Sequence, residues 1–265
     1  MSVIEDIREQ QKKALNEMTL KEKLSYFWYY YKVHLLVAVA VIVLIVTFVN
    51  QYRNHKDYAF YATFVNAAYN DYTLSDTWSE EFAEYAGIDT DEYSVYIDNS
   101  IQLSEMSSSQ YAIANQEKLV ALMQAGSVGA FVADTETFES YAQFQYFANL
   151  EDILTPEQIE KYKDYFYYTD AAAFDSDEDT LMSEEAQNAI YAKVIDHNDP
   201  STMEQPIAVG FYVGDTDKMQ SSGCYDYLAE NDYSFQGYPS EAILGIPVTY
   251  EDTNTAIAFL EYLGL

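Results

Sequence analysis

Three aspartates in the second half of the chain have the spacing of a calcium-binding loop. Asp175, Asp177 and Asp179 match positions 1, 3 and 5 of such a loop, and carboxylate oxygens are ligands that Ca²⁺ prefers. Position 6 of that loop is normally glycine and position 12 glutamate, whereas Thr180 and Ala186 stand there in this chain. Calcium is therefore the only cofactor that the residues suggest, and a solvated acidic loop is the competing interpretation.

Side chains that carry most metal and nucleophile chemistry are scarce. There are three histidines, His34, His55 and His197, and the first two flank a long apolar run, which argues against a histidine zinc site. The single cysteine, Cys224, excludes an intrachain disulfide. Patterns of zinc proteases, serine hydrolases and nucleotide-binding loops are absent. A hydrolase with paired carboxylates is the third-ranked hypothesis, and we predict that the protein is not an enzyme.

Polar side chains directly follow four predicted strands and form the second candidate site. These residues are Asn66, Asp98, Asn99, Asp134 and Asp215. In open α/β sheets, ligands bind beyond the carboxyl ends of the strands. We therefore predict that these side chains line a ligand site, and their carboxylates and amides suit a small polar or cationic ligand.

Strand and helix patterns alternate through the region that carries these residues. Short runs rich in aromatic and β-branched residues predict strands at 58–65, 93–97, 128–133, 207–213 and 242–248. Apolar residues at helical spacing predict helices between them, with Ser75 capping the first and Thr155 opening a later one through a capping box. This alternation predicts an α/β domain at 57–265 with a largely parallel sheet, as one body or two small lobes.

A long apolar run precedes that domain. Residues 33–49 contain only two polar side chains, His34 and Thr47. A helix of that length rises about 25 Å, and the aromatic residues 27–31 extend it toward the roughly 30 Å of a bilayer core. We predict a transmembrane helix at 33–52 that acts as an uncleaved signal anchor, because no small-residue cleavage site follows it. A buried core helix and a cleaved signal peptide are the alternatives.

The distribution of Lys and Arg orients the predicted span. Residues 1–32 hold six Lys and Arg, whereas residues 57–265 hold five lysines and no arginine. The positive-inside rule therefore predicts a cytoplasmic arm at 1–32 and an extracellular domain at 57–265, in a single-pass protein of the cell membrane.

The charge balance excludes one class of partner. The chain has 13 Lys and Arg against 44 Asp and Glu, a formal net charge of −31, and residues 57–265 hold 39 of the acidic side chains. Nucleic-acid binding needs clustered Lys and Arg, so we expect no nucleic-acid partner. An apolar content of 49% excludes a disordered acidic tail.

Two stretches of the domain resemble a known family. The runs VGAFVADTETFESYAQFQYFANLEDIL and LGIPVTYEDTNTAIAFLEYL resemble segments of extracellular solute-binding proteins with the type 2 periplasmic-binding fold. The run TLKEKLSYFWYYYKVH resembles the start of uncharacterised single-pass proteins of Gram-positive bacteria. The resemblance implies a membrane-anchored domain with a periplasmic-binding-protein-like fold.

Two functions follow as hypotheses. The first is a membrane-tethered, solute-binding-like module that captures a small polar or cationic ligand for a transporter or a sensor. The alternative is a structural or interaction protein of the cell envelope that has the same fold and no ligand, and whose partner is another envelope protein.

Overall fold

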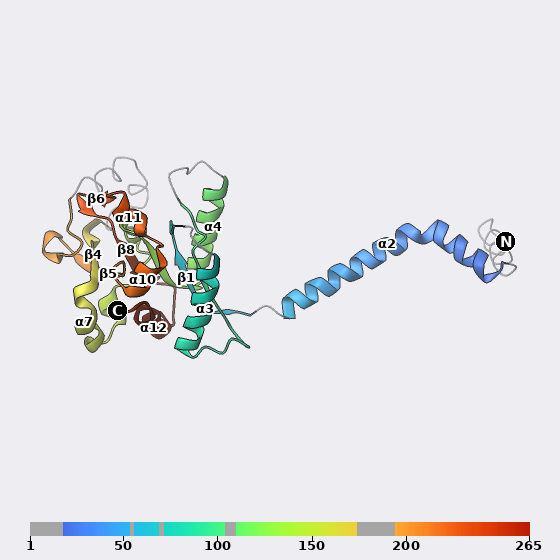
Figure 1. Ribbon diagram of the computed structural model, residues 1–265, viewed down its shortest axis with the longest axis horizontal. Helices are drawn as coiled ribbons and strands as arrows, with labels where there is room; N and C mark the ends of the chain where they lie inside the picture. Colours follow the sequence, from blue (N-terminus) through green and yellow to red (C-terminus); the bar gives the residue numbers. More distant parts are fainter. Residues whose placement is uncertain (1–17, 54–55, 69–71, 104–109, 174–193) are drawn as a thin grey trace. The chain divides into compact units, whose positions relative to one another are not determined.

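The computed structural model describes residues 18–53, 56–68, 72–103, 110–173 and 194–265 (Figure 1). Contacts divide the chain into two compact units, Met1–His55 and Lys56–Leu265. The predicted calcium ligands Asp175, Asp177 and Asp179 lie outside the described residues, so the calcium site stays a prediction.

The first unit contains one long helix, α2 (Leu20–Arg53). Thr19 precedes it, and the Glu22 carboxylate accepts hydrogen bonds from the Thr19 backbone N–H and hydroxyl, each at 2.8 Å. This arrangement satisfies a backbone donor that a helix start otherwise leaves free. The most apolar window of α2 has a mean hydropathy of 2.7, and none of it is buried by other described residues. Such a helix is compatible with a single-pass membrane anchor or with a signal sequence.

The second unit is built on a six-stranded sheet in the order β2-β1-β3-β8-β5-β4. Its strands are β1 (Tyr58–Phe64), β2 (Ser94–Asp98), β3 (Val128–Asp134), β4 (Phe166–Asp170), β5 (Pro206–Tyr212) and β8 (Ala242–Gly245). A small hairpin of β6 (Ser234–Phe235) and β7 (Tyr238–Pro239) precedes β8.

The sheet is mixed, so the prediction of a largely parallel sheet is wrong. β1 is parallel to β2 and to β3, whereas the pairs β3–β8, β5–β8 and β4–β5 are antiparallel. A parallel connection must carry the chain back along the full length of a strand. Only α10 (Asp217–Ser222) and α11 (Asp226–Glu230) separate β5 from the hairpin and β8, and a six-residue helix rises only about 9 Å. The chain therefore enters β8 at the edge where β5 ends.

Helices cover both faces of the sheet. On one face α3 (Tyr72–Ala86), α6 (Leu150–Ile153), α7 (Pro156–Tyr162) and α12 (Thr253–Leu263) enclose a core that contains Phe60, Phe82 and Phe259. On the other face α4 (Gln110–Gln124) and α5 (Thr135–Ala142) cover a second core. Tyr61 of the second core follows Phe60 directly, because successive strand residues point to opposite faces.

Several local predictions are confirmed and three differ in detail. The capping box at Thr155 is present, with both hydrogen bonds to Gln158. Ser75 does not cap α3, because that helix begins at Tyr72 and the buried Ser75 hydroxyl donates to the Ile97 carbonyl. The last strand ends at Gly245 instead of residue 248. β4 has no counterpart among the predicted strands, although it forms an edge of the sheet.

Candidate functional site

The sheet topology brings several predicted site residues to one edge. β1, β3 and β5 run in the same direction, and the antiparallel strand β8 begins where they end. Asn66 follows β1, Asp134 ends β3 and Asp215 follows β5, while Glu241 immediately precedes β8. We call this the carboxyl edge. Sequence reasoning missed Glu241, because the direction of β8 cannot be read from its own residues.

Asn66 and Asp134 contact each other, but their polar atoms are occupied by the protein. The Asn66 amide Nδ2 donates to Thr137 Oγ1 at 3.0 Å and to Asp134 Oδ2 at 3.3 Å, and its Oδ1 accepts from the Leu103 backbone N–H at 2.7 Å. Asp134 also caps α5 by accepting from the Thr137 N–H at 2.9 Å. This pair therefore ties the loop after β1 to the start of α5, which is a structural role.

Asp98 belongs to a separate buried ion pair at the end of β2. Its carboxylate accepts from the Tyr61 hydroxyl, from Ser100 and from Lys118 Nζ at 2.7 Å. Burial alone raises its pKa, but the hydrogen bonds from Lys118, Ser100 and Tyr61 outweigh it and hold the pKa of Asp98 below its ordinary value. Asn99 is also buried. Among the described residues, no hydrogen bond joins Asp98 to Asn66 or Asp134.

Asp215 and Glu241 are the other two carboxylates of the carboxyl edge, and unlike Asp134 neither of them caps a described helix. Asp215 is exposed and Glu241 is half-buried, and neither side chain makes an ion pair with a described residue. Burial, followed by repulsion from Asp215, raises the pKa of Glu241. Thr135 fixes the Glu241 backbone, because its hydroxyl accepts from the Glu241 N–H at 2.9 Å and donates to the Glu241 carbonyl at 3.2 Å. A positive group placed here would relieve the repulsion between the two carboxylates.

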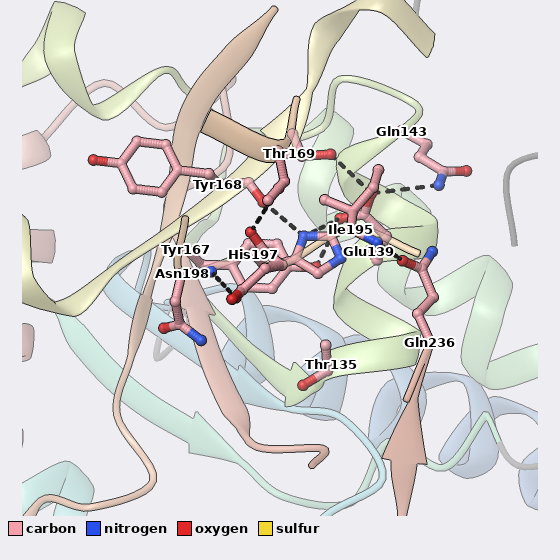
Figure 2. Close-up of polar contacts among 12 residues, drawn as sticks. Thr135, Glu139, Gln143, Tyr167, Tyr168, Thr169, Ile195, His197, Asn198 and Gln236 are labelled. Atoms are coloured by element: carbon pink, nitrogen blue, oxygen red, sulfur yellow. Dashed lines mark hydrogen bonds and ion pairs between the residues drawn. The ribbon is translucent and has the colours of Figure 1, made fainter. Parts of the chain in front are cut away.

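A second polar cluster, shown in Figure 2, is buried between α5 and β4. Its centre is Glu139, which is 3% exposed. The Glu139 carboxylate accepts from the hydroxyls of Tyr167 and Thr169, each at 2.8 Å, and from the Gln143 amide at 3.4 Å. Burial is the largest effect on Glu139 and raises its pKa, and it outweighs the lowering of the pKa by His197 and by these donors. We call these residues together with His197 the Glu139 cluster.

His197 joins the Glu139 cluster from the segment that precedes β5. Its ring stacks on Tyr167 with centroids 4.5 Å apart and planes 8° from parallel. Ring atom Nδ1 lies 2.7 Å from the Tyr168 carbonyl oxygen and 3.9 Å from Glu139 Oε2 (Figure 2). The ring is 4% exposed, and Nε2 has no hydrogen-bond partner among the described residues.

Sequence reasoning did not identify this cluster, although one signal was present. Thr135, Phe138, Glu139 and Ala142 are the buried residues of α5, and their spacing is that of one helix face. A glutamate in the apolar stripe of a helix indicates a buried carboxylate that needs partners. The partners themselves come from β4 and from residue 197, and sequence spacing does not connect these to α5.

Comparison of the chain with family models, with curated proteins and with solved structures finds no match. Within the described residues, no group of three or more His, Cys, Asp and Glu side chains is arranged to hold a metal ion. The functional argument therefore rests on the geometry of the carboxyl edge and of the Glu139 cluster.

Proposed function

We propose that the protein is a single-pass membrane protein whose second unit is an extracellular binding module for a small cationic solute, which it presents to a transporter or a sensor. The observation that carries this proposal is the Asp215–Glu241 pair at the carboxyl edge. Two neighbouring carboxylates, one of them half-buried, form a site of negative potential with no cation of the protein's own within ion-pair distance among the described residues.

The lysines of the second unit support a cationic ligand over an anionic one. Each described lysine beyond residue 57 already forms an ion pair with a carboxylate. The pairs are Lys118–Asp98, Lys161–Glu261, Lys163–Glu160 and Lys218–Glu81, at 2.7 to 2.8 Å. Two of these lysines, Lys161 and Lys218, also lie over tyrosine rings. An anionic ligand would therefore have to displace an existing ion pair, whereas a cation would not.

The membrane anchor completes the proposal. The exposed apolar surface of α2 suits a bilayer, and the six Lys and Arg before residue 33 favour a cytoplasmic N-terminus. A domain tethered outside the membrane would hold its ligand close to a transporter, at a high effective concentration.

The second candidate is a ligand-free interaction protein of the cell envelope, and one observation favours it. Asn66, Asp98 and Asp134, three of the predicted ligand residues, use their polar atoms for internal hydrogen bonds. A ligand at these three positions would have to replace bonds that hold the fold together. Only Asp215, of the predicted set, is both exposed and without an ion pair to a described residue.

The test is a calorimetric titration of the full chain in lipid nanodiscs with spermidine, and with a neutral disaccharide as the uncharged probe. We expect spermidine to bind and the disaccharide not to bind. Asp215→Asn and Glu241→Gln should each weaken spermidine binding about tenfold, which corresponds to about 1.4 kcal/mol.

The matched control is Asp91→Asn, which removes the same charge from an exposed position before β2, at the end of the parallel strands opposite the carboxyl edge. It should change the dissociation constant less than about twofold, because exposed charges separated by more than about 10 Å are screened by salt. Equal weakening by all three variants would mean that spermidine responds only to net charge, and it would overturn the site. Absence of binding would favour the ligand-free interaction protein.

A further inference from the structure

At the outer edge of β4, a single residue bonds both outward backbone groups of Tyr168. β4 is the last strand of the sheet, so every second residue turns its backbone N–H and C=O away from β5. At Tyr168 both of these groups form hydrogen bonds with His197. The Tyr168 N–H donates to the His197 carbonyl at 3.0 Å, and the Tyr168 carbonyl accepts from the His197 ring at 2.7 Å. His197 therefore occupies the position that the next strand would take.

The hydrogen bond from the ring fixes its tautomer. A carbonyl oxygen only accepts, so Nδ1 must carry the hydrogen that it donates to Tyr168. The second ring nitrogen, Nε2, is buried and has no acceptor among the described residues. A proton on Nε2 would place an unpaired N–H and a positive charge in the interior. The geometry therefore favours a neutral His197.

A neutral His197 leaves the Glu139 carboxylate without an opposite charge. The groups that face Glu139 are Tyr167 and Thr169 of β4, Gln143 of α5, His197, and, at longer range, Tyr212 of β5. None of these carries a positive charge when His197 is neutral. Two further carboxylates, Asp196 and Glu241, act on Tyr212, so the surroundings are negative. Tyr167 and Thr169 have hydroxyls, which accept as well as donate, so protonated Glu139 keeps its partners.

We propose that the Glu139 cluster is a pH-dependent latch: with Glu139 protonated, the cluster is neutral and holds His197 on the edge of β4, and with Glu139 ionised, the hold weakens. The deprotonated carboxylate carries a buried charge that only the opening of the segment 195–198 brings into water. Opening also frees the N–H and C=O of Tyr168, which makes the β4 edge available for pairing with another extended segment.

The direction of the pH effect follows from linkage. Burial raises the pKa of Glu139 in the closed state, so the closed state binds the proton more tightly than the open state does. The latch is therefore fully stable below the ordinary glutamate pKa of 4.5 and weakens as the pH rises through the raised pKa. Between the ordinary pKa and the raised pKa, the closed-to-open ratio should fall about tenfold per pH unit, and it should level off once the closed state is also ionised.

Hydrogen exchange of the full chain in nanodiscs tests the latch at single amides. We expect protection of the Tyr168 amide, corrected for the intrinsic exchange rate, to fall between pH 5 and pH 8. The Ile97 amide is the internal control, because its acceptor is the Ser79 hydroxyl on the opposite edge of the sheet and nothing there ionises in this range. Its protection should not change by more than about twofold over the same interval.

Glu139→Gln decides between the latch and an ordinary ion pair. The amide imitates the protonated carboxyl, so the variant should protect Tyr168 at least tenfold better than the unmodified chain at pH 8 and show no pH dependence. Glu117→Gln, the same change at an exposed position of α4, should match the unmodified chain. If Glu139→Gln instead speeds exchange at Tyr168, Glu139 and His197 form a stabilising ion pair and the proposal is wrong. Equal pH dependence at Tyr168 and Ile97 would also overturn it.

Discussion

The two edges of the sheet are closed in different ways. At the β2 edge, two hydroxyls of α3 bond the outward backbone groups of Ile97: Ser79 accepts from its N–H at 3.0 Å, and Ser75 donates to its carbonyl. At the β4 edge, His197 does both tasks for Tyr168, with a backbone carbonyl and a ring nitrogen. Serine hydroxyls do not ionise in the physiological range, whereas the Glu139 carboxyl, which lies beside His197, is ionisable. The side chains that close the β2 edge are therefore not ionisable, whereas the residue that closes the β4 edge lies beside an ionisable carboxyl.

A buried carboxylate lies near each edge, and the two have opposite pKa shifts. Asp98 has Lys118, whose half-exposed side chain brings a positive charge to within 2.7 Å, and its pKa is lowered. Glu139 has only neutral donors and His197, and its pKa is raised. Burial penalises both charges, and the hydrogen bond from Lys118 is the largest of the effects that lower the pKa of Asp98. Similar burial therefore accompanies a lowered pKa at one edge and a raised pKa at the other.

Among the substitutions considered, removing the cation at the β2 edge should lower the free energy of unfolding the most. Lys118→Met leaves the buried Asp98 charge without compensation. Breaking a fully buried pair costs about 3 to 5 kcal/mol, and because Lys118 is 46% exposed we expect about 2 kcal/mol at pH 7. Urea unfolding of the full chain in detergent measures this loss. Lys163→Met is the control, since its pair with Glu160 is exposed and should contribute less than about 1 kcal/mol.

The pH dependence of the stability of Lys118→Met tests the same ion pair. The lowered pKa of Asp98 means that its contribution to stability is present above the ordinary value of 3.8 and is lost as the pH falls through the folded-state pKa. In Lys118→Met this contribution should be largely absent, so the variant and the unmodified chain should approach each other in stability below that pKa. A constant difference from pH 7 to pH 3 would contradict the ion-pair explanation.

Ser79→Ala should cause the second-largest loss in the free energy of unfolding. It leaves the Ile97 N–H without its acceptor, and an unpaired buried donor costs about 1 to 3 kcal/mol. We expect a loss of about 1.5 kcal/mol that is the same at pH 5 and pH 8, measured by urea unfolding at both values. A loss that depends on pH would show that the β2 edge also contains a titrating group, and the contrast between the edges would fail.

Glu139→Gln should have the smallest effect on global stability and the opposite sign. The raised pKa of Glu139 means that its ionisation destabilises the fold as the pH rises. The variant should therefore be more stable than the unmodified chain at pH 8 and equal to it below pH 4.5. Urea unfolding across this range provides the measurement, and a destabilised variant at pH 8 would contradict the sign of the shift.

Local rules predicted most of the elements in the second unit. Gly87 and Gly126 end α3 and α4 with φ angles of 66° and 67°, a conformation that glycine adopts without strain. The run at 128–133 was correctly predicted as a strand, and six of the seven residues of β3 are buried, as expected for a continuous apolar strand covered on both faces. These features depend on neighbours within a few residues along the chain, so the amino-acid order is sufficient to find them.

The candidate site was predicted only in part, because the sequence does not reveal the direction of each strand in the sheet. Asn66 and Asp134 do meet, because β1 and β3 are parallel neighbours. Glu241 joins the carboxyl edge only because β8 runs antiparallel between β3 and β5. Strand direction depends on how the intervening helices return the chain, which the composition of the strand itself does not record.

The sequence by itself determined the long apolar helix, the acidic excess and the alternation of strands and helices, because each is a property of composition or of short-range periodicity. The tertiary structure alone decided which carboxylates are compensated. Lys118 reaches Asp98 across 20 positions, and Thr169 reaches Glu139 across 30. Ionisation depends on charges and dipoles within a few ångströms in space, and the fold, not the distance along the chain, sets that neighbourhood.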